Sequence, residues 1–187
     1  MRLILASSSP RRAELLATAG FSFEVRPAEV DETPAPAERP EEYALRVARD
    51  KAKAVGRRES GSAILAADTV VVADGEILGK PVDDTDAERM LKRLSGAVHE
   101  VHTAVVLLTD GGRREALVTT KVRLLPLSDN EIHWYIATGE PQGKAGAYAI
   151  QGHAARFVDH IEGLWSNVVG LPIATVYRML KDCGILY

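Results

Sequence analysis

Apolar runs and helical spacings alternate along the chain, and their order predicts strands interleaved with helices. Arg2 to Ala6 form a short apolar run, and the apolar positions of Pro10 to Ala19 then follow helical spacing. Ser9 stands at the expected N-cap of this helix, a proline opens it and Gly20 follows its end, as is favoured at helix termini. A strand followed by a helix is therefore predicted, with a second short strand at Phe23 to Arg26.

The next segment changes from an acidic, proline-rich stretch to a helix. Pro27 to Pro40 contain four prolines and four acidic residues, which predicts an exposed, irregular loop of a kind that is often functional. From Glu41 to Arg57 the apolar positions follow helical spacing and place Lys51 near the buried face. Two interpretations of Lys51 stay open: its stem lies on the core with the ammonium in water, or the ammonium serves a chemical purpose.

A buried strand with one carboxylate in it follows. The run AILAADTVVVADGEIL predicts a strand, a hairpin turn at Asp74-Gly75 and a short return strand. Asp68 interrupts its apolar pattern, so it either faces a site or bonds to neighbouring amides. A second amphipathic helix is predicted from Asp86 to Ser95, ending at Gly96.

The second half of the chain adds a long hairpin and further helices. VHEVHTAVVLLTD and RREALVTTKVRLLPL predict two strands joined through Gly111-Gly112, and the spacing of Ser128 and Glu131 predicts a capping box. A glycine-rich segment, a strand at Arg156 to Ile161, the loop EGLWSNVVGLP and a helix from Pro172 to Cys183 complete the chain. Helices interleaved with strands that include a long hairpin favour an α/β fold with a mixed sheet flanked by helices.

Composition supports one domain and argues against several classes of protein. The 187 residues, 46% of them hydrophobic, can bury a large core, so we expect a single domain over residues 1–187. The 23 basic and 26 acidic side chains nearly cancel, so neither nucleic acid nor a membrane is an expected partner. Cys183 is the only cysteine, and no apolar run is long enough to span a bilayer. We expect a cytoplasmic protein.

The start of the first helix combines hydroxyl and guanidinium groups. Ser7, Ser8 and Ser9 are either turn and cap residues or, with Arg11 and Arg12, parts of a phosphate cradle. The helix dipole disfavours cations in the first turn, and bound phosphate would offset that conflict. The segment therefore indicates an anion site.

The acidic candidates are Asp68 and a group on the proline-rich loop. Asp68 is suited to activate water or to hold a divalent ion, and Thr69 beside it is expected on the other face of the strand. Glu29, Asp31 and Glu32 form either a solvated surface or a source of ligands for Mg²⁺.

Lysines and histidines give weaker signals. Lys80 and Lys144 each follow a glycine in a turn-like setting and are either solvated or available to phosphate. The five histidines lack a metal-binding spacing. His99 and His102 fall on opposite faces of a strand, and we expect them to be surface or hydrogen-bonded residues.

Seven motifs in a fixed order resemble those of the Maf family of nucleoside triphosphate pyrophosphatases. They are SSSPRR, EVDE, AADTVV, LGKP, LSG, EPQGKAGAYAIQG and NVVGLP, and together they cover nearly the whole chain. The resemblance implies an α/β fold with a twisted mixed sheet, two lobes and a central cleft, similar to inosine triphosphate pyrophosphatases. It also implies hydrolysis of a nucleoside triphosphate to the monophosphate and pyrophosphate with a divalent cation, Mg²⁺ or Mn²⁺.

The same resemblance implies roles for individual residues. Asp68 is the expected proton acceptor, and Arg11, Thr69 and Gln151 bear on the choice of substrate. Other polar positions of the family site are matched by Ser7, Arg12, Glu32, Lys51, Lys80 and Lys144. The segment AGAYAIQG resembles the branch acting on dTTP and UTP. Leu164 stands where relatives often have serine, and with Trp165 it either packs under its loop or lines the base pocket.

We therefore expect a metal-dependent pyrophosphatase for dTTP and UTP, with Asp68 and Glu32 as metal ligands. Two alternatives stay open: a nucleotide-binding regulator of cell division without significant catalysis, and a pyrophosphatase for 7-methyl-GTP or other modified nucleotides. Only an enzyme needs Asp68. The expected partner is the nucleoside triphosphate, and a homodimer is an expectation from the family alone.

Overall fold

A computed structural model describes residues 1–186, and its strands form one mixed sheet. The order is β2-β1-β3-β5-β6-β7, and β4 pairs with β3. β1 runs parallel to β2 and β3, whereas the β3–β4 and β6–β7 pairs are antiparallel. The strands are β1 (Arg2–Leu5), β2 (Glu24–Val25), β3 (Ser62–Ala73), β4 (Glu76–Leu78), β5 (Val98–Thr109), β6 (Gly112–Leu124) and β7 (Val158–Glu162). The predicted α/β fold with a mixed sheet is confirmed.

The chain divides into two compact units that interleave along the sequence. Unit 1 comprises Met1–Asp68, Thr103–Val118 and the chain from Gly170 onward, and unit 2 comprises Thr69–His102 and Thr119–Val169. Residues of β3, β5 and β6 therefore belong to both units. The single domain and the central cleft stay predictions.

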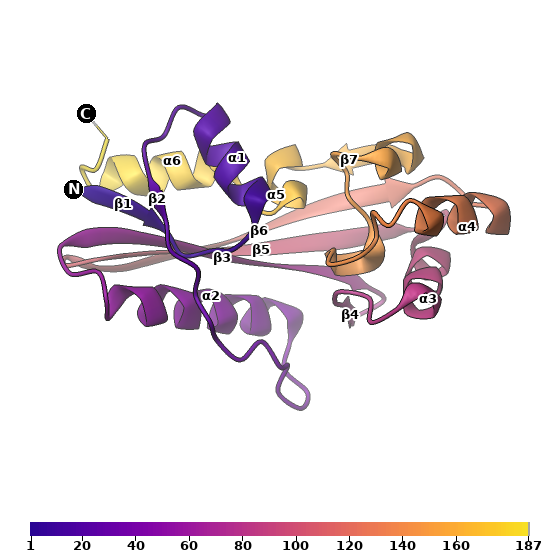
Figure 1. Cartoon of the computed structure of the whole chain (residues 1–187), viewed down its shortest axis with the longest axis horizontal. Coiled ribbons are helices and arrows are strands. Elements are labelled where there is room, and N and C mark those ends of the chain that lie inside the picture. The colour runs from indigo at the N-terminus through magenta and orange to yellow at the C-terminus, as the bar shows by residue number, and fades with distance from the viewer. Residues whose placement is uncertain (187) are drawn as a thin grey trace. The chain divides into compact units, whose positions relative to one another are not determined.

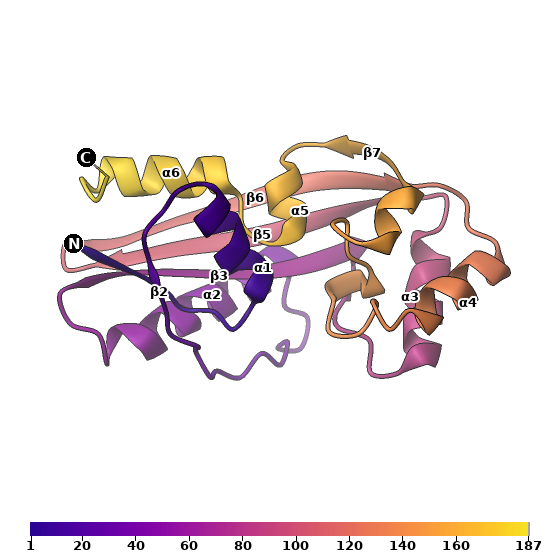
Figure 2. The same cartoon turned by 45° about the horizontal axis from the view of Figure 1, so that its top comes forward.

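Unit 1 places helices on both faces of its strands. α2 (Pro40–Gly56) lies on one face, and α1 (Pro10–Thr18) and α6 (Ile173–Asp182) lie on the other, as the views of Figure 1 and Figure 2 show. The apolar positions of α2 are buried as the spacing predicts, and Lys51 is buried among them. Burial of these apolar faces is the main stabilising contribution to this unit.

Unit 2 contains five helices within its described residues. They are α3 (Asp84–Leu94), α4 (Asp129–Ala137), η1 (Ala145–Ala147), η2 (His153–Phe157) and α5 (Trp165–Val169). α3 packs against α4 and η1. The capping box is confirmed, since the Ser128 side chain accepts from the Glu131 amide and the Glu131 carboxylate accepts from the Ser128 amide.

Two predicted boundaries and one predicted loop in unit 2 were wrong. α3 begins two residues early because Asp83, through an oxygen 2.8 Å from the Asp86 amide nitrogen, caps it. The predicted strand at Arg156 starts only at Val158, after η2. The loop EGLWSNVVGLP contains the short helix α5, whose few residues have no long apolar period to reveal it.

His99 and His102 are both buried, so their predicted surface alternative was wrong and the hydrogen-bonded alternative was right. The His99 ring nitrogen Nε2 lies 2.8 Å from the Tyr148 hydroxyl, and His102 Nδ1 lies 2.8 Å from Thr119 Oγ1. Burial lowers the pKa of His99 to about 4, so this ring is neutral at physiological pH.

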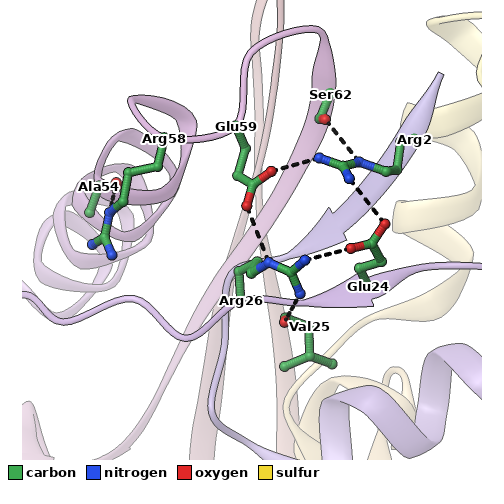
Figure 3. Close-up of polar contacts among 8 residues, drawn as sticks. All are labelled: Arg2, Glu24, Val25, Arg26, Ala54, Arg58, Glu59 and Ser62. Atoms are coloured by element: carbon green, nitrogen blue, oxygen red, sulfur yellow. Dashed lines mark hydrogen bonds and ion pairs between the residues drawn. The ribbon is translucent and has the colours of Figure 1, made fainter.

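A closed ring of four charges lies in unit 1, and Figure 3 shows it. Arg2 contacts Glu24 at 3.3 Å and Glu59 at 2.6 Å, and Arg26 contacts the same two carboxylates at 2.7 and 3.2 Å. We call these four residues the charge ring. They connect β1 and β2 to the segment that leads into β3.

Within the described residues 1–186, none of the helices has the length and apolar character of a membrane span.

Candidate functional site

The ten predicted site residues divide between the two units. Unit 1 holds Ser7, Arg11, Arg12, Glu32, Lys51 and Asp68, and unit 2 holds Thr69, Lys80, Lys144 and Gln151.

The Lys51 ammonium joins two predicted carboxylates in unit 1. Its Nζ lies 2.8 Å from an Asp68 oxygen and 2.7 Å from a Glu32 oxygen. Lys51 and Asp68 are only 7% and 6% exposed. Of the two interpretations of Lys51, the ammonium in water was wrong, because the charge meets carboxylates from β3 and from the proline-rich loop. Helix α2, the loop and the sheet thus converge on one cation.

Burial changes the acidity of Asp68. Desolvation raises its pKa above the ordinary value, and this effect outweighs the opposing attraction of Lys51 and Arg12. The negative charge of Glu32 raises the pKa further. A raised pKa makes the Asp68 carboxylate a stronger base than an exposed aspartate, which suits a group that accepts a proton from water.

Arg12 hydrogen-bonds the chain segments next to Asp68. Its Nε donates to the Gly170 carbonyl at 2.8 Å, and one terminal nitrogen donates to the Ala67 carbonyl at 2.8 Å and to Ser7 Oγ at 3.3 Å. Ser7 Oγ also accepts from the amide of Ser9 at 3.1 Å. Because Ala67 directly precedes Asp68, Arg12 ties the start of α1 to the strand position that carries the carboxylate. Burial lowers the pKa of Arg12, whereas Asp68 raises it.

Arg11 differs from its neighbour. It is half-buried, and within residues 1–186 its side chain has no hydrogen bond or ion pair. Burial lowers its pKa, and it also lies near enough to Arg12 to repel that charge. The helix dipole disfavours both cations. Carbonyl oxygens of the protein compensate the guanidinium of Arg12, whereas no group within residues 1–186 does so for the side chain of Arg11.

Sequence reasoning missed the residues that hold Glu32 in place. The Tyr43 hydroxyl donates to the Glu32 carbonyl at 2.8 Å, and Arg46 donates to the Thr33 carbonyl at 3.0 Å. Arg46 also binds both Glu38 oxygens, at 2.7 and 2.8 Å. Residues 43, 47 and 51 are spaced by four and share one face of α2, a signal that was present in the sequence.

Tyr43 is sensitive to the same cluster of charges. Burial raises its pKa to about 12, and the nearby charges of Asp68 and Glu32 act in the same direction. Its hydroxyl therefore stays protonated at neutral pH and remains a donor to the loop.

In unit 2 the two predicted lysine segments lie together. The Gly146 amide donates to the Gly79 carbonyl at 3.1 Å, which joins the turn before Lys80 to the glycine-rich segment. Gly146 has a φ of 68° and a Cβ there would lie 2.9 Å from Val71 Cγ1, so only glycine fits this contact. Lys144 Nζ donates to the Glu140 and Gln142 carbonyls at 3.3 and 3.1 Å.

The residues around Lys51 fit a divalent cation. Within residues 1–186 no group of three or more His, Cys, Asp or Glu could hold a metal by itself. Glu32 and Asp68 nevertheless face one common cation, the Lys51 ammonium. Mg²⁺ is commonly held by one or two carboxylates and completes its shell with phosphate oxygens and water. This pair therefore suits a metal that arrives with a phosphorylated ligand.

A hollow of about 330 Å³ in unit 2 contains none of the predicted residues. It is lined by Val98, Lys121, Arg123, His160 and Glu162. Strand register places Lys121 opposite Glu162 and Arg123 opposite His160. Because both signs of charge face each other, the hollow has no evident preference for an anion.

Comparisons with known proteins agree with this chemistry. The family model described as "Maf-like protein" matches residues 2–183. A protein of Anaeromyxobacter dehalogenans named dTTP/UTP pyrophosphatase is 53% identical, over 98% of this chain and 94% of its own length. Proteins of the same name from Koribacter versatilis and Geobacter sulfurreducens are each 52% identical, covering 100% and 99% of this chain and 96% and 98% of their own.

Two solved structures share the fold. The Ham1 protein of Staphylococcus aureus has a TM-score of 0.55 at 13% identity, covering 97% of this chain and 99% of its own. A HAM1 protein of Coxiella burnetii has a TM-score of 0.52 at 17% identity, with the same two coverages. At such low identity the likeness concerns the fold alone.

Proposed function

Because the chain belongs to the family of Maf-like proteins, we propose that it hydrolyses dTTP and UTP to the nucleoside monophosphate and pyrophosphate. Relatives at 51–54% identity bear the name of that activity. The observation that carries the proposal is the buried ion pair of Asp68 and Lys51, which the more exposed carboxylate of Glu32 joins. A carboxylate with a raised pKa at a cation-rich position is the arrangement expected where water attacks a polyphosphate.

Positive charge in unit 1 exceeds negative charge where the phosphates would bind. Arg11, Arg12 and Lys51 are cations, and Asp68 and Glu32 are the carboxylates among them. Arg11 has no partner within residues 1–186, so it can meet a phosphate oxygen without breaking an existing ion pair. A guanidinium can bind phosphate through two parallel hydrogen bonds.

Asp68 acts as the general base. It takes a proton from water as the water oxygen forms a bond to the α-phosphorus. The bond from that phosphorus to the bridging oxygen of the β-phosphate breaks, and pyrophosphate leaves with the bonding electron pair. Lys51 holds the carboxylate in place, and the Arg12 contact to the Ala67 carbonyl fixes the strand beside it.

A divalent ion, Mg²⁺ or Mn²⁺, would be held by Asp68 and Glu32. When bound, such an ion neutralises phosphate charge and polarises the reacting phosphoryl group. The loop that carries Glu32 is ordered by Tyr43 and Arg46, so Glu32 is held for this task before the nucleotide arrives.

The residues of unit 2 keep their predicted roles as proposals. Lys80 and Lys144 contact the triphosphate, and Thr69 and Gln151 take part in substrate choice together with Arg11. An amide side chain such as that of Gln151 offers both a donor and an acceptor, as the edge of a pyrimidine requires.

A panel of nucleoside triphosphates tests the activity. Purified protein with Mg²⁺ or Mn²⁺ is assayed for pyrophosphate and orthophosphate release from dTTP, UTP, the other common triphosphates and 7-methyl-GTP. We expect pyrophosphate from dTTP and UTP. Orthophosphate without pyrophosphate contradicts the proposal, and tight nucleotide binding without turnover favours the regulator. Preferential turnover of 7-methyl-GTP assigns the chain to the other branch.

A further inference from the structure

The segment that carries Gln151 is wrapped around the carboxylate of Glu140. One Glu140 oxygen accepts from the His153 amide at 2.8 Å and from His153 Nδ1 at 2.9 Å. The other accepts from the Ala154 amide at 3.2 Å and from the Tyr135 hydroxyl at 2.8 Å. Four donors therefore meet at one side chain.

Tyr135 links Glu140 to the main chain that precedes Gln151. Its hydroxyl oxygen accepts from the Ala149 amide at 3.1 Å while its hydrogen goes to Glu140. Tyr135 is fully buried at 0% exposure, so the position of its hydroxyl is fixed by packing. Gln151 thus lies between main-chain groups that are bound on both sides, and its own side chain is exposed.

The carboxyl group of Glu140 is ionised although it is shielded from water. Burial by itself raises the pKa of its carboxyl, but the hydrogen bonds from His153, Tyr135 and Ala154 more than offset burial and lower it. Glu140 is therefore ionised at neutral pH with only 16% of its side chain exposed. A shielded carboxylate is costly unless its hydrogen bonds are made, so it favours the one loop conformation that makes them.

Gly152 shows how closely the chain approaches. A Cβ at this position would lie 2.0 Å from a Glu140 oxygen. Any larger residue directly after Gln151 would displace either the carboxylate or the chain. Glycine here is explained by the wrapping of the loop around Glu140, since its φ is −111° and needs no special residue.

We propose that Glu140 is a positioning residue that fixes Gln151 in its substrate-binding conformation. The inference rests on the proposed function, in which Gln151 contacts the base. A side chain held in its bound conformation loses less entropy when the ligand binds. Glu140 also accepts through its carbonyl from Lys144, so one residue supports both predicted substrate contacts of this segment.

Glu140→Gln is the test variant, and Glu131→Gln is the matched control. Glutamine keeps the size of the side chain but turns an acceptor into a donor that faces another donor. Glu131 is a carboxylate of the neighbouring helix α4, where it serves the capping box. Tyr135→Phe is the second variant, because it removes only one hydroxyl and keeps the packed ring.

Two measurements distinguish a role of Glu140 in positioning Gln151 from a general contribution to the stability of the fold. Hydrogen exchange of the Ala149, His153 and Ala154 amides is expected to be at least about tenfold faster in Glu140→Gln and unchanged in Glu131→Gln. The dissociation constant for a UTP analogue with a non-hydrolysable α–β bridge is expected to rise about tenfold, with kcat for UTP within about threefold of wild type. Tyr135→Phe is expected to change both quantities in the same direction by less.

A double-mutant cycle decides whether Glu140 acts through Gln151. We expect Glu140→Gln with Gln151→Ala to bind the analogue no more weakly than Gln151→Ala alone, because the two changes remove the same contact. Additive losses, or an unchanged dissociation constant in both Glu140→Gln and Tyr135→Phe, overturn the inference. If Glu140→Gln does not fold, Tyr135→Phe takes its place in the double-mutant cycle with Gln151→Ala.

The proposed function is tested separately, because wild-type protein that releases no pyrophosphate refutes it. Hydrogen exchange and binding of the analogue still test the positioning role of Glu140 in that case.

Discussion

Unit 1 contains two assemblies of charged side chains that differ in burial and in completeness. In the charge ring each of Arg2, Glu24, Arg26 and Glu59 meets two partners of opposite sign, and both arginines are nearly half exposed. The second assembly, the Lys51 cluster, consists of Arg11, Arg12, Glu32, Lys51 and Asp68. The side chains of Lys51 and Asp68 are only 9% exposed, whereas that of Glu32 is 41% exposed. Water screens the first assembly and is largely excluded from the Lys51–Asp68 pair of the second.

The two assemblies also differ in how completely their charges are paired. The ring closes on itself with two positive and two negative groups, so it has nothing left to offer a ligand. The Lys51 cluster sets three cations, Arg11, Arg12 and Lys51, against the carboxylates Asp68 and Glu32. Holding excess charge in a poorly solvated place is unfavourable in the free protein. It is the cost expected of a site that binds a polyanion.

The largest expected effect is at Asp68. Asp68→Asn keeps the shape of the side chain but cannot accept a proton from water, so kcat for dTTP is expected to fall by at least about 10²-fold. Glu59→Gln, the matching change in the charge ring, is expected to leave kcat unchanged. Circular dichroism checks that both variants fold, and turnover of Asp68→Asn close to wild type would remove Asp68 from the mechanism.

The second prediction concerns pH and Lys51. The folded-state pKa of Asp68 is raised. As pH falls, Asp68 therefore loses its basic, ionised form at a higher pH than an ordinary aspartate does. Lys51→Met removes a charge that lowers the pKa of Asp68, so the acid limb of kcat/KM is expected to move up by about 1 to 3 pH units. A limb that stays in place, measured for dTTP, contradicts the assignment of that limb to Asp68.

The same raised pKa has a consequence for stability. Between the unfolded and the raised folded pKa of Asp68, the folded state binds more protons than the unfolded state. The stabilising contribution is therefore present below the unfolded value and is lost as pH rises through the folded value. Asp68→Asn is expected to remove this part of the pH dependence, which urea unfolding at several pH values measures.

The third prediction separates Arg11 from Arg12. Arg11→Gln removes a charge without partners in residues 1–186, so KM is expected to rise about tenfold with little loss of stability. Arg12→Gln leaves the buried Gly170 and Ala67 carbonyls short of a donor and is expected to cost about 1 to 3 kcal/mol of unfolding free energy. Kinetics and urea unfolding on both variants test this, and equal effects on stability would contradict it.

The smallest effect is expected in the charge ring. Arg26→Gln opens the ring, and because both of its arginines are nearly half exposed the loss is expected to be less than about 1 kcal/mol. Added salt should reduce the difference from wild type further, since exposed pairs are screened. Urea unfolding at low and high salt measures this. A loss of several kcal/mol would show that the ring acts as more than surface pairs.

Local chemistry made several elements predictable. The Ser128–Glu131 capping box, the turn at Asp74-Gly75 and the proline that opens α1 depend on residues within a few positions of each other. The apolar pattern singled out Lys51 and Asp68 as candidates, and motif resemblance added Gln151 and the expected roles of the site residues. The boundaries that failed, at α3, β7 and α5, lie where a cap or a short element leaves little periodic signal.

The sequence by itself determined the alternation of strands and helices, because propensity, caps and apolar spacing act over a few residues. Only the tertiary structure decided what each polar group does. Arg12 meets a carbonyl 158 positions away and Lys51 meets a carboxylate 17 positions away, and Glu140 collects donors from a loop more than ten positions along the chain. Burial and hydrogen bonding, which depend on those distant partners, separate the supporting Arg12 from the unpaired Arg11 although the two are adjacent in sequence and identical in kind.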